Sequence, residues 1–259
     1  MKRTVFKMAF RLAASLLWLG VATAACAGAD STRVVLFFGD SLTAGYGVGV
    51  ERAYPAVIQA RIDSLGLDFE VVNAGLSGET TAAGLRRIDW ILRRPVAVFV
   101  LELGGNDGLR GLPLEHTKEN LQQILKRVRE REPDAVLVVA GMRLPPNLGP
   151  LYIEQFRAIF PWLAERTGAL LIPFLLEGVG GDAAFMLPDG IHPTAEGHRL
   201  VADVVWKQLG SVLGDTTNAG EGISVGASQD FERRGRVDAA AAGQTGDSGD
   251  QGDADEGDH

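Results

Sequence analysis

The chain has 259 residues and a formal net charge of −8, and 46% of its residues are hydrophobic, enough for a substantial buried core. Its body, from about residue 30 to residue 213, carries 22 acidic and 18 basic residues. This near balance gives no reason to expect a nucleic-acid partner. The single cysteine, Cys26, excludes an internal disulfide.

Residues 1–29 have the layout of a secretory signal peptide, with a basic start, an uncharged apolar run from Leu12 to about Ala25, and small residues that fit a cleavage site. The run is short for a membrane span, which needs about 20 residues. We therefore predict an exported, periplasmic protein with no stable membrane span after cleavage. Small residues before Cys26 leave a lipoprotein site open, although Thr23 stands where such sites usually have leucine.

Five apolar runs of strand length alternate with five segments of helical spacing. The runs are Val34–Phe38, Phe69–Val72, Val96–Leu101, Ala135–Ala140 and Leu170–Pro173. They are continuous, as in strands that are covered on both faces of a parallel sheet. The helical stripes are Tyr54–Leu65, Leu85–Leu92, Leu121–Val128, Phe156–Leu163 and Leu200–Leu209. This alternation predicts an α/β domain over residues 30–213, a three-layer α/β/α sandwich of the flavodoxin-like kind with a five-stranded parallel sheet.

Residues 214–259 differ in composition from this body. They are rich in Gly, Asp, Ala and Ser and contain 11 acidic and 3 basic residues. Such a segment cannot bury enough apolar surface to offset the entropy of ordering it. We therefore predict a disordered acidic tail.

Four polar turns are expected at one edge of the sheet. They are Gly39–Leu42, Asn73–Gly78, Gly104–Asp107 and Asp189–Pro193. The first three directly follow predicted strands. Ligands of parallel α/β sheets bind outside the carboxyl ends of the strands, so these turns predict a site at that edge.

Ser41 is the candidate nucleophile of this site, although a serine here could instead cap the segment that follows. Serine attack needs a base beside the hydroxyl and a partner that orients the base. His192, held before Pro193 at a predicted helix start, is the candidate base. Asp189, three residues earlier, can accept a hydrogen bond from its imidazole. His198 falls inside the following helix and is interpreted as a surface or packing residue.

The candidate oxyanion donors are the backbone N–H groups of Ser41 and Gly78 and the side-chain amide of Asn106. Taken singly, Gly78 is better explained as a turn glycine and Asn106 as a turn asparagine that bonds its own backbone. Asp40 and Asp107 are interpreted as acids that brace the loops. No histidine and carboxylate pair has metal-ligand spacing on one helix, so no metal or other cofactor is expected.

These residues resemble the four sequence blocks of the SGNH (GDSL) hydrolases, in order and at the spacing of that family. The strings Glu102–Gly111 and Met142–Asn147 are similar to its bacterial periplasmic acyl-CoA thioesterase I, lysophospholipase and arylesterase subgroup. The resemblance extends from Arg33 to Leu213. It implies an SGNH hydrolase domain with Ser41 as nucleophile and Asp189 and His192 as its partners. It also implies an oxyanion hole made by Ser41, Gly78 and Asn106. The acidic tail is outside the family pattern.

Apolar residues are frequent in the loops of the predicted functional edge: Leu109, Leu112, Leu144, Leu148, Phe174, Leu175, Phe185, Met186 and Leu187. They suit a fatty acyl chain, which gains about 0.8 kcal/mol per buried methylene, or they seal the end of the sheet.

We predict a serine esterase that hydrolyses small-molecule acyl esters and thioesters through an acyl-serine intermediate. A carbohydrate O-deacetylase is the alternative. A non-catalytic flavodoxin-like binding module is less favoured, because phosphate-binding glycine motifs are absent.

Overall fold

Parallel β-strands form the centre of the structure, a computed structural model in which residues 32–214 are described. The predicted signal peptide with Cys26 lies outside the described residues. So does the predicted acidic tail, apart from Gly214, which ends the last helix in a left-handed conformation. Among residues 32–214, no helix is both long enough and apolar enough to cross a membrane.

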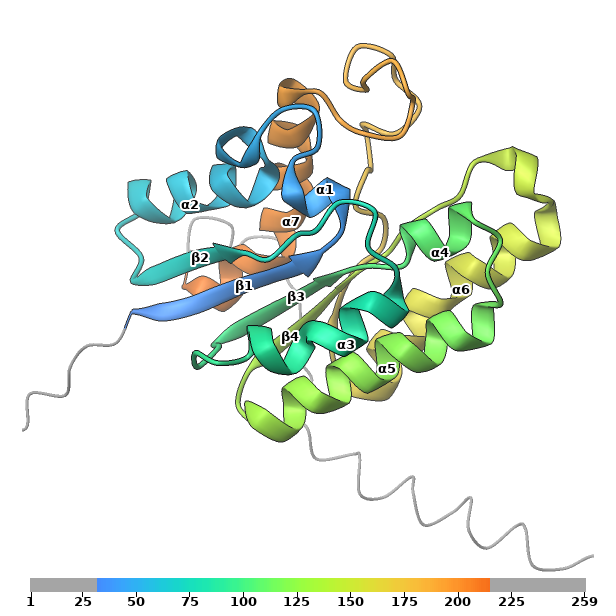
Figure 1. The fold of residues 1–259 in the computed structure, drawn as a ribbon. Helices are drawn as coiled ribbons and strands as arrows, with labels where there is room; N and C mark the ends of the chain where they lie inside the picture. The colour runs from blue at the N-terminus through green and yellow to red at the C-terminus, as the bar shows by residue number, and fades with distance from the viewer. Residues whose placement is uncertain (1–31, 215–259) are drawn as a thin grey trace, which may run out of the picture. The chain divides into compact units, whose positions relative to one another are not determined.

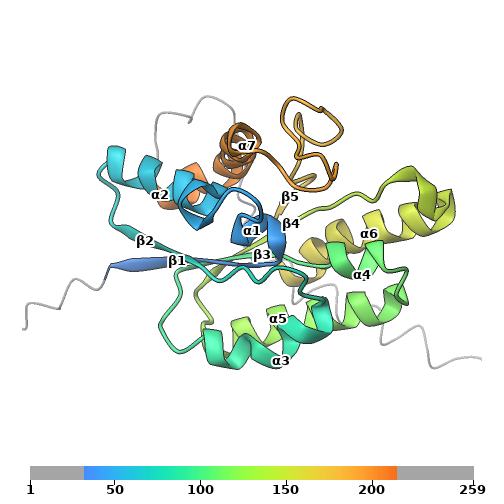
Figure 2. The ribbon, with the colours of Figure 1, turned by 45° about the horizontal axis from the view of Figure 1, so that its top comes forward.

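The five strands follow the predicted apolar runs closely and confirm the α/β class with a five-stranded parallel sheet. They are β1 (Arg33–Gly39), β2 (Phe69–Asn73), β3 (Val98–Glu102), β4 (Val136–Ala140) and β5 (Leu170–Ile172). Their order across the sheet is β2-β1-β3-β4-β5 (Figure 1 and Figure 2). After β1 the chain adds β2 on one side and then crosses to add β3 on the other. Such a reversal opens a crevice between the carboxyl ends of β1 and β3, and Ser41 lies just after the end of β1.

The five longer helices match the predicted helical stripes. They are α2 (Tyr54–Ser64), α3 (Thr81–Ile91), α5 (Leu114–Arg131), α6 (Pro150–Thr167) and α7 (Ala195–Leu213). Two shorter helices, α1 (Ser41–Ala44) and α4 (Gly105–Leu109), and two 3-10 turns (Val50–Arg52 and Pro146–Leu148) were not predicted. A helix of four or five residues is too short to show an apolar stripe. These two short helices nevertheless carry Ser41 and Asn106.

Each face of the sheet is covered by a separate set of helices, as expected for side chains that alternate along a strand. Leu36 and Phe38 pack with buried residues of α3, α5 and α6. Phe37 packs on the opposite face with α2 and α7, and the centroid of its ring lies 5.4 Å from that of Tyr54. Figure 2 shows α2 and α7 on one side of the sheet and α3 and α5 on the other. The strands are therefore buried on both faces, which explains their continuous apolar sequences.

Candidate active site

Ser41, His192 and Asp189 form a continuous chain of hydrogen bonds, in the arrangement expected from the sequence. The Nε2 atom of His192 lies 2.9 Å from Ser41 Oγ, although the two residues are 151 positions apart. Nδ1 of the same ring lies 2.7 Å from Asp189 Oδ2. If Nδ1 carries the ring proton and donates a hydrogen bond to Asp189, Nε2 is free to accept a hydrogen bond from the serine hydroxyl.

The loop around Asp189 holds the histidine by backbone contacts as well. Asp189 Oδ1 accepts hydrogen bonds from the N–H groups of Ile191 (2.9 Å) and His192 (3.0 Å). The left-handed conformation of Gly190, φ 66°, permits this turn. Partial burial raises the pKa of Asp189, but the hydrogen bonds from His192 and Ile191 outweigh it and lower this pKa to about 2. Asp189 is therefore ionised near neutral pH and can balance a charge on the imidazole.

Ser41 begins helix α1 directly after β1, but it does not cap that helix. The cap is Asp40, whose Oδ1 accepts the N–H of Leu42 at 3.1 Å. The interpretation of Ser41 as an N-cap is therefore wrong. Because the neighbouring acid does the capping, the hydroxyl of Ser41 is left to contact His192.

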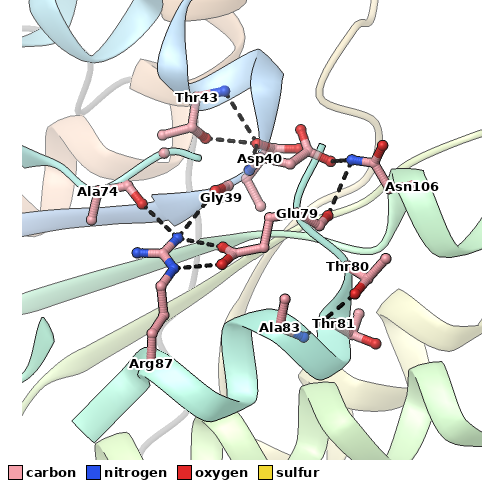
Figure 3. A network of polar contacts seen from close by, with 12 residues as sticks. Gly39, Asp40, Thr43, Ala74, Glu79, Thr80, Thr81, Ala83, Arg87 and Asn106 are labelled. Carbon is pink, nitrogen blue, oxygen red and sulfur yellow. Dashed lines mark hydrogen bonds and ion pairs between the residues drawn. The ribbon is translucent and has the colours of Figure 1, made fainter. Parts of the chain in front are cut away.

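Asn106, in α4, lies beside residues 39–43, which contain Ser41 and are called the nucleophile turn. Its Nδ2 atom donates hydrogen bonds to Asp40 Oδ2 and to the backbone oxygen of Glu79, both at 3.1 Å (Figure 3). Burial raises the pKa of Asp40 to about 6, against the lowering effect of the bonds from Leu42 and Asn106. Asp40 thus braces this region, as predicted, and links the turn of Ser41 to the amide of Asn106.

Gly78 precedes helix α3, which begins at Thr81 with Thr80 as its N-cap. Its φ of 77° is a conformation that favours glycine, and its backbone oxygen accepts a hydrogen bond from Arg110 at 3.1 Å. Asp107 braces the start of α3 by accepting the N–H (2.9 Å) and the hydroxyl (2.6 Å) of Thr81. The loop of Gly78 and the helix of Asn106 are therefore tied together, while their roles as oxyanion donors remain predictions.

An ion pair that was not predicted from the sequence fixes the loop between β2 and α3. Arg87 of α3 binds the carboxylate of Glu79, with an Nε–Oε1 distance of 2.6 Å, and donates to Ala74 O at 2.8 Å (Figure 3). The guanidinium also lies 4.2 Å above the ring of Phe38. These contacts join the loop to β1 and to the end of β2, so the segment containing Gly78 has a defined position.

Tyr46 and Glu102 are two further residues of this region that were not assigned from the sequence. The ring centroid of Tyr46 lies 4.4 Å from that of His192. Glu102, at the end of β3, is fully buried and contacts the nucleophile turn. The available signal for Glu102 was an acidic residue that closes an otherwise apolar strand. Tyr46 stands in a turn between glycines, where a partner cannot be identified without coordinates.

His198 is a packing residue and not a surface residue. Only 1% of it is exposed, and its Nδ1 accepts the backbone N–H of Tyr54 at 3.2 Å. Burial, and then the charge of His192, lower the pKa of His198 to about 4. It is therefore neutral near pH 7, and its position in the core separates it from the role of base.

The nine apolar residues expected at the rim differ in burial. Four of them are half-buried: Leu148, Phe174, Phe185 and Leu187. Leu144, Leu175 and Met186 are buried and seal the end of the sheet, which was the second interpretation of this set. Leu109 and Leu112 are exposed. Three further exposed apolar side chains lie close in sequence to the site residues and were not predicted: Tyr46, Leu76 and Ile191. Over the described part of the chain, no group of three or more His, Cys, Asp or Glu side chains is arranged to hold a metal ion.

Comparison with known proteins identifies relatives of this arrangement. The model of the GDSL-like Lipase/Acylhydrolase family matches residues 37–200. Esterase TesA of Pseudomonas aeruginosa is 38% identical over 184 residues, which cover 71% of this chain and 90% of that protein. Thioesterase 1/protease 1/lysophospholipase L1 of Escherichia coli K12 is 39% identical over 205 residues, 79% of this chain and 95% of the relative.

A solved structure agrees with these matches in fold. The crystal structure of the psychrotrophic esterase EstA from Pseudoalteromonas sp., inhibited by monoethylphosphonate, aligns with a TM-score of 0.66 and 31% identity. The alignment covers 70% of this chain and 98% of EstA. The three-layer α/β/α architecture is therefore shared with an esterase over nearly the whole length of that protein.

Proposed function

The chain belongs to the GDSL-like lipase/acylhydrolase family of carboxylic ester hydrolases, and we propose that it is an exported serine esterase that hydrolyses acyl esters and thioesters through an acyl-Ser41 intermediate. The observation that supports this mechanism is the run of contacts from Ser41 Oγ to His192 Nε2 (2.9 Å) and from His192 Nδ1 to Asp189 Oδ2 (2.7 Å). At the first distance a base can take a serine proton, and at the second a carboxylate can orient that base.

In the proposed first step, His192 Nε2 accepts the proton of Ser41 as Oγ bonds to the acyl carbon. Ionised Asp189 stabilises the imidazolium through Nδ1–H. The tetrahedral intermediate then collapses: the bond to the leaving group breaks, and His192 returns the proton to the departing oxygen or sulfur. Water attacks the acyl-serine in the same way, with His192 first taking and then returning a proton, so that the carboxylic acid leaves and free Ser41 is restored.

The oxyanion of each intermediate would be bound by the N–H groups of Ser41 and Gly78 and by the amide of Asn106. The described contacts give Asn106 a specific task in this scheme. Its Nδ2 atom donates to Asp40 Oδ2 and to Glu79 O. The charged oxygen would have to compete with one of these acceptors, and the other would keep the amide oriented.

The acyl substrate class is supported by the relatives and by the surface beside the site. Two of the relatives are described as an esterase and as a thioesterase and lysophospholipase. Exposed apolar side chains such as Leu76 and Leu109 offer contacts for an acyl chain.

Export to the periplasm rests on residues 1–29, and a lipid anchor at Cys26 is the less favoured form. Mass spectrometry of the mature N-terminus distinguishes the two, because an unmodified start at Ala25 or later excludes the lipid.

The experiment that tests the proposal replaces the nucleophile. Ser41→Ala should lower kcat for p-nitrophenyl esters by about 10⁴-fold or more, because no acyl-enzyme can form. It should also abolish labelling by a fluorophosphonate. Ser64→Ala is the matched control, since Ser64 is an exposed serine at the end of α2.

The substrate panel should contain p-nitrophenyl esters of increasing chain length, acyl-CoA, lysophospholipids and acetylated sugars. Undiminished ester hydrolysis by Ser41→Ala would refute the mechanism. Hydrolysis of acetylated sugars alone would instead identify a carbohydrate O-deacetylase, and absence of both hydrolysis and labelling in the wild type would favour a non-catalytic module.

A further inference from the structure

Glu102 is a buried acid that the proposed mechanism does not use. It is the last residue of β3, after four apolar residues of the same strand, and none of its surface is exposed. In the sheet it lies opposite Gly39, the last residue of β1. Its carboxyl group is therefore placed next to the point where the chain leaves β1 and enters the nucleophile turn.

The carboxyl group binds the backbone on both sides of Ser41. Oε2 of Glu102 accepts hydrogen bonds from the N–H of Asp40 at 3.2 Å and from the N–H of Thr43 at 3.3 Å. The hydroxyl of Thr43 also donates to it, at 2.6 Å. One oxygen atom thus holds the residue before the nucleophile and the residue two positions after it.

Gly39 shows how closely this carboxyl approaches the main chain. A Cβ atom at Gly39 would lie 2.2 Å from Thr43 Oγ1, 2.4 Å from Glu102 Oε2 and 2.6 Å from the backbone oxygen of Glu102. Cβ atoms do not approach other atoms so closely, so the first residue of the Gly39-Asp40-Ser41 sequence must lack a side chain beside both the backbone and the carboxyl group of Glu102. The glycine and the glutamate are therefore parts of one arrangement.

Hydrogen bonds continue from Thr43 to two further buried residues, Tyr54 and His198. The hydroxyl of Thr43 lies 2.8 Å from the hydroxyl of Tyr54, whose backbone N–H donates to His198 Nδ1. Thr43 and Tyr54 are both fully buried. The turn of Ser41 is thus connected through Glu102 and Thr43 to α2, and from there to α7.

Retaining an acid at this position is costly for stability. Burial, followed by the charge of Asp40, raises the pKa of Glu102 well above its ordinary value. Its second oxygen, Oε1, is buried without a hydrogen-bond partner among the described residues. An apolar side chain of similar volume commonly stabilises such a site, because a buried polar group that is incompletely bonded carries a desolvation cost. A role in activity accounts for the acid better than a role in stability.

The effect of Glu102 extends to the amide of Asn106. Asp40, whose N–H is bound by Glu102, accepts the N–H of Leu42 and the side-chain amide of Asn106 with its own carboxyl group. A displacement of Asp40 would therefore move both the serine that follows it and the acceptor that orients Asn106.

We propose that Glu102 is a positioning residue for ester hydrolysis: by binding the backbone of Asp40 and Thr43 it keeps Ser41 Oγ within hydrogen-bonding distance of His192 Nε2. This inference rests on the proposed serine mechanism. It assigns no contact with substrate to Glu102. A shift of the nucleophile by about 1 Å can lower a rate by about 10²-fold, so the effect should appear in kcat and leave KM nearly unchanged.

The test is a series of variants made in the full chain: Glu102→Leu, Glu102→Gln, Thr43→Val and Tyr54→Phe. Glu102→Leu removes every bond to the turn, and kcat for a p-nitrophenyl ester should fall about 10²-fold. Glu102→Gln keeps an acceptor oxygen and should recover part of that loss, to about tenfold below wild type. Thr43→Val should lose less than Glu102→Gln, and Tyr54→Phe least, because its hydroxyl reaches the carboxyl only through Thr43. The rate of fluorophosphonate labelling of Ser41 should follow the same order.

Leu101→Ala is the matched control, because Leu101 is a neighbouring buried residue of β3. It should lower the thermal unfolding temperature and leave kcat and the labelling rate unchanged. The inference is overturned if Glu102→Leu and Glu102→Gln keep the wild-type kcat, or if Leu101→Ala loses as much kcat at an equal loss of stability. If Glu102→Leu does not fold, Glu102→Gln and Thr43→Val decide by the same criteria.

Failure of the proposed function would look different. In that case the wild type would be inactive or Ser41→Ala would remain active, and no order would appear among the Glu102 and Thr43 variants. A graded loss across the series together with an inactive Ser41→Ala supports both proposals.

Discussion

The loop of Asp189 and the buried pair formed by Asp40 and Glu102 both bring carboxyl groups to the active site, but in opposite environments. The side chain of Asp189 is 37% exposed, and hydrogen bonds outweigh partial burial to lower its pKa to about 2. Asp40 is only 3% exposed, and burial raises its pKa to about 6. Glu102 is fully buried, and burial together with Asp40 raises its pKa as well.

This difference separates two uses of an acid. A carboxylate that water still reaches stays ionised at little cost, so Asp189 can balance the charge that His192 gains and loses in each proposed step. A buried carboxyl group loses its solvation and is stabilised mainly by the donors around it. Asp40 and Glu102 therefore hold backbone and amide groups in place.

The largest effect is expected where the exposed acid is altered. Asp189→Asn should lower kcat by about 10⁴-fold, because an amide can no longer hold the imidazole in the tautomer that accepts the serine proton. Folding should be little affected, which urea unfolding would verify. Asp182→Asn is the control, since Asp182 lies in the same connection and its side chain accepts the backbone N–H of Ala184. Equal losses of kcat in the two variants would show that the loop and not the carboxylate is responsible.

A smaller effect is expected at the amide that the buried pair orients. Asn106→Ala removes a predicted oxyanion donor and should lower kcat by about 10²–10³-fold. Asn73→Ala provides the comparison, because Asn73 donates to Thr43 O at 2.7 Å and braces the same turn without being a predicted donor. It should cost about tenfold or less. If Asn73→Ala is as impaired as Asn106→Ala, the loss at Asn106 reflects support of the turn and not oxyanion binding.

The smallest effect concerns stability at different pH values. The pKa of Asp40 rises from 3.8 in the unfolded chain to about 6 in the folded protein. Between these two pH values the folded protein keeps a proton on Asp40 that the unfolded chain has released. The stability gained from this group is complete below pH 3.8 and is lost as the pH rises through about 6. The wild type should lose this stability as the pH rises, and Asp40→Asn should not. The free energy of unfolding of Asp40→Asn minus that of the wild type should therefore increase by about 3 kcal/mol from acidic to neutral pH.

Urea unfolding at a series of pH values measures this difference, with exposed Asp68→Asn as the control. The comparison between variants matters more than the absolute values, because Asp40→Asn also changes the contact with Asn106. A gap between variant and wild type that stays constant with pH would contradict the raised pKa of Asp40.

Local sequence patterns were sufficient for the sheet, the long helices and the placement of Ser41, Asp189 and His192. Continuous apolar runs reveal strands, a serine in the turn after such a run is visible without coordinates, and so is a histidine before a proline at a predicted helix start. Helices α1 and α4 were missed because four or five residues cannot display a period of 3.6. The burial of His198, Leu175 and Met186 was not predicted either, because it depends on what packs against them.

The sequence by itself determined which segments become strands and helices and which reactive side chains stand in the connecting turns, because these depend on neighbours along the chain. Only the tertiary structure decided the order β2-β1-β3-β4-β5 and the meeting of Ser41 with His192 across 151 residues. It also decided that Glu102 faces the nucleophile turn, since its partners come from the end of another strand. Such contacts arise from packing between distant segments, and no local preference encodes them.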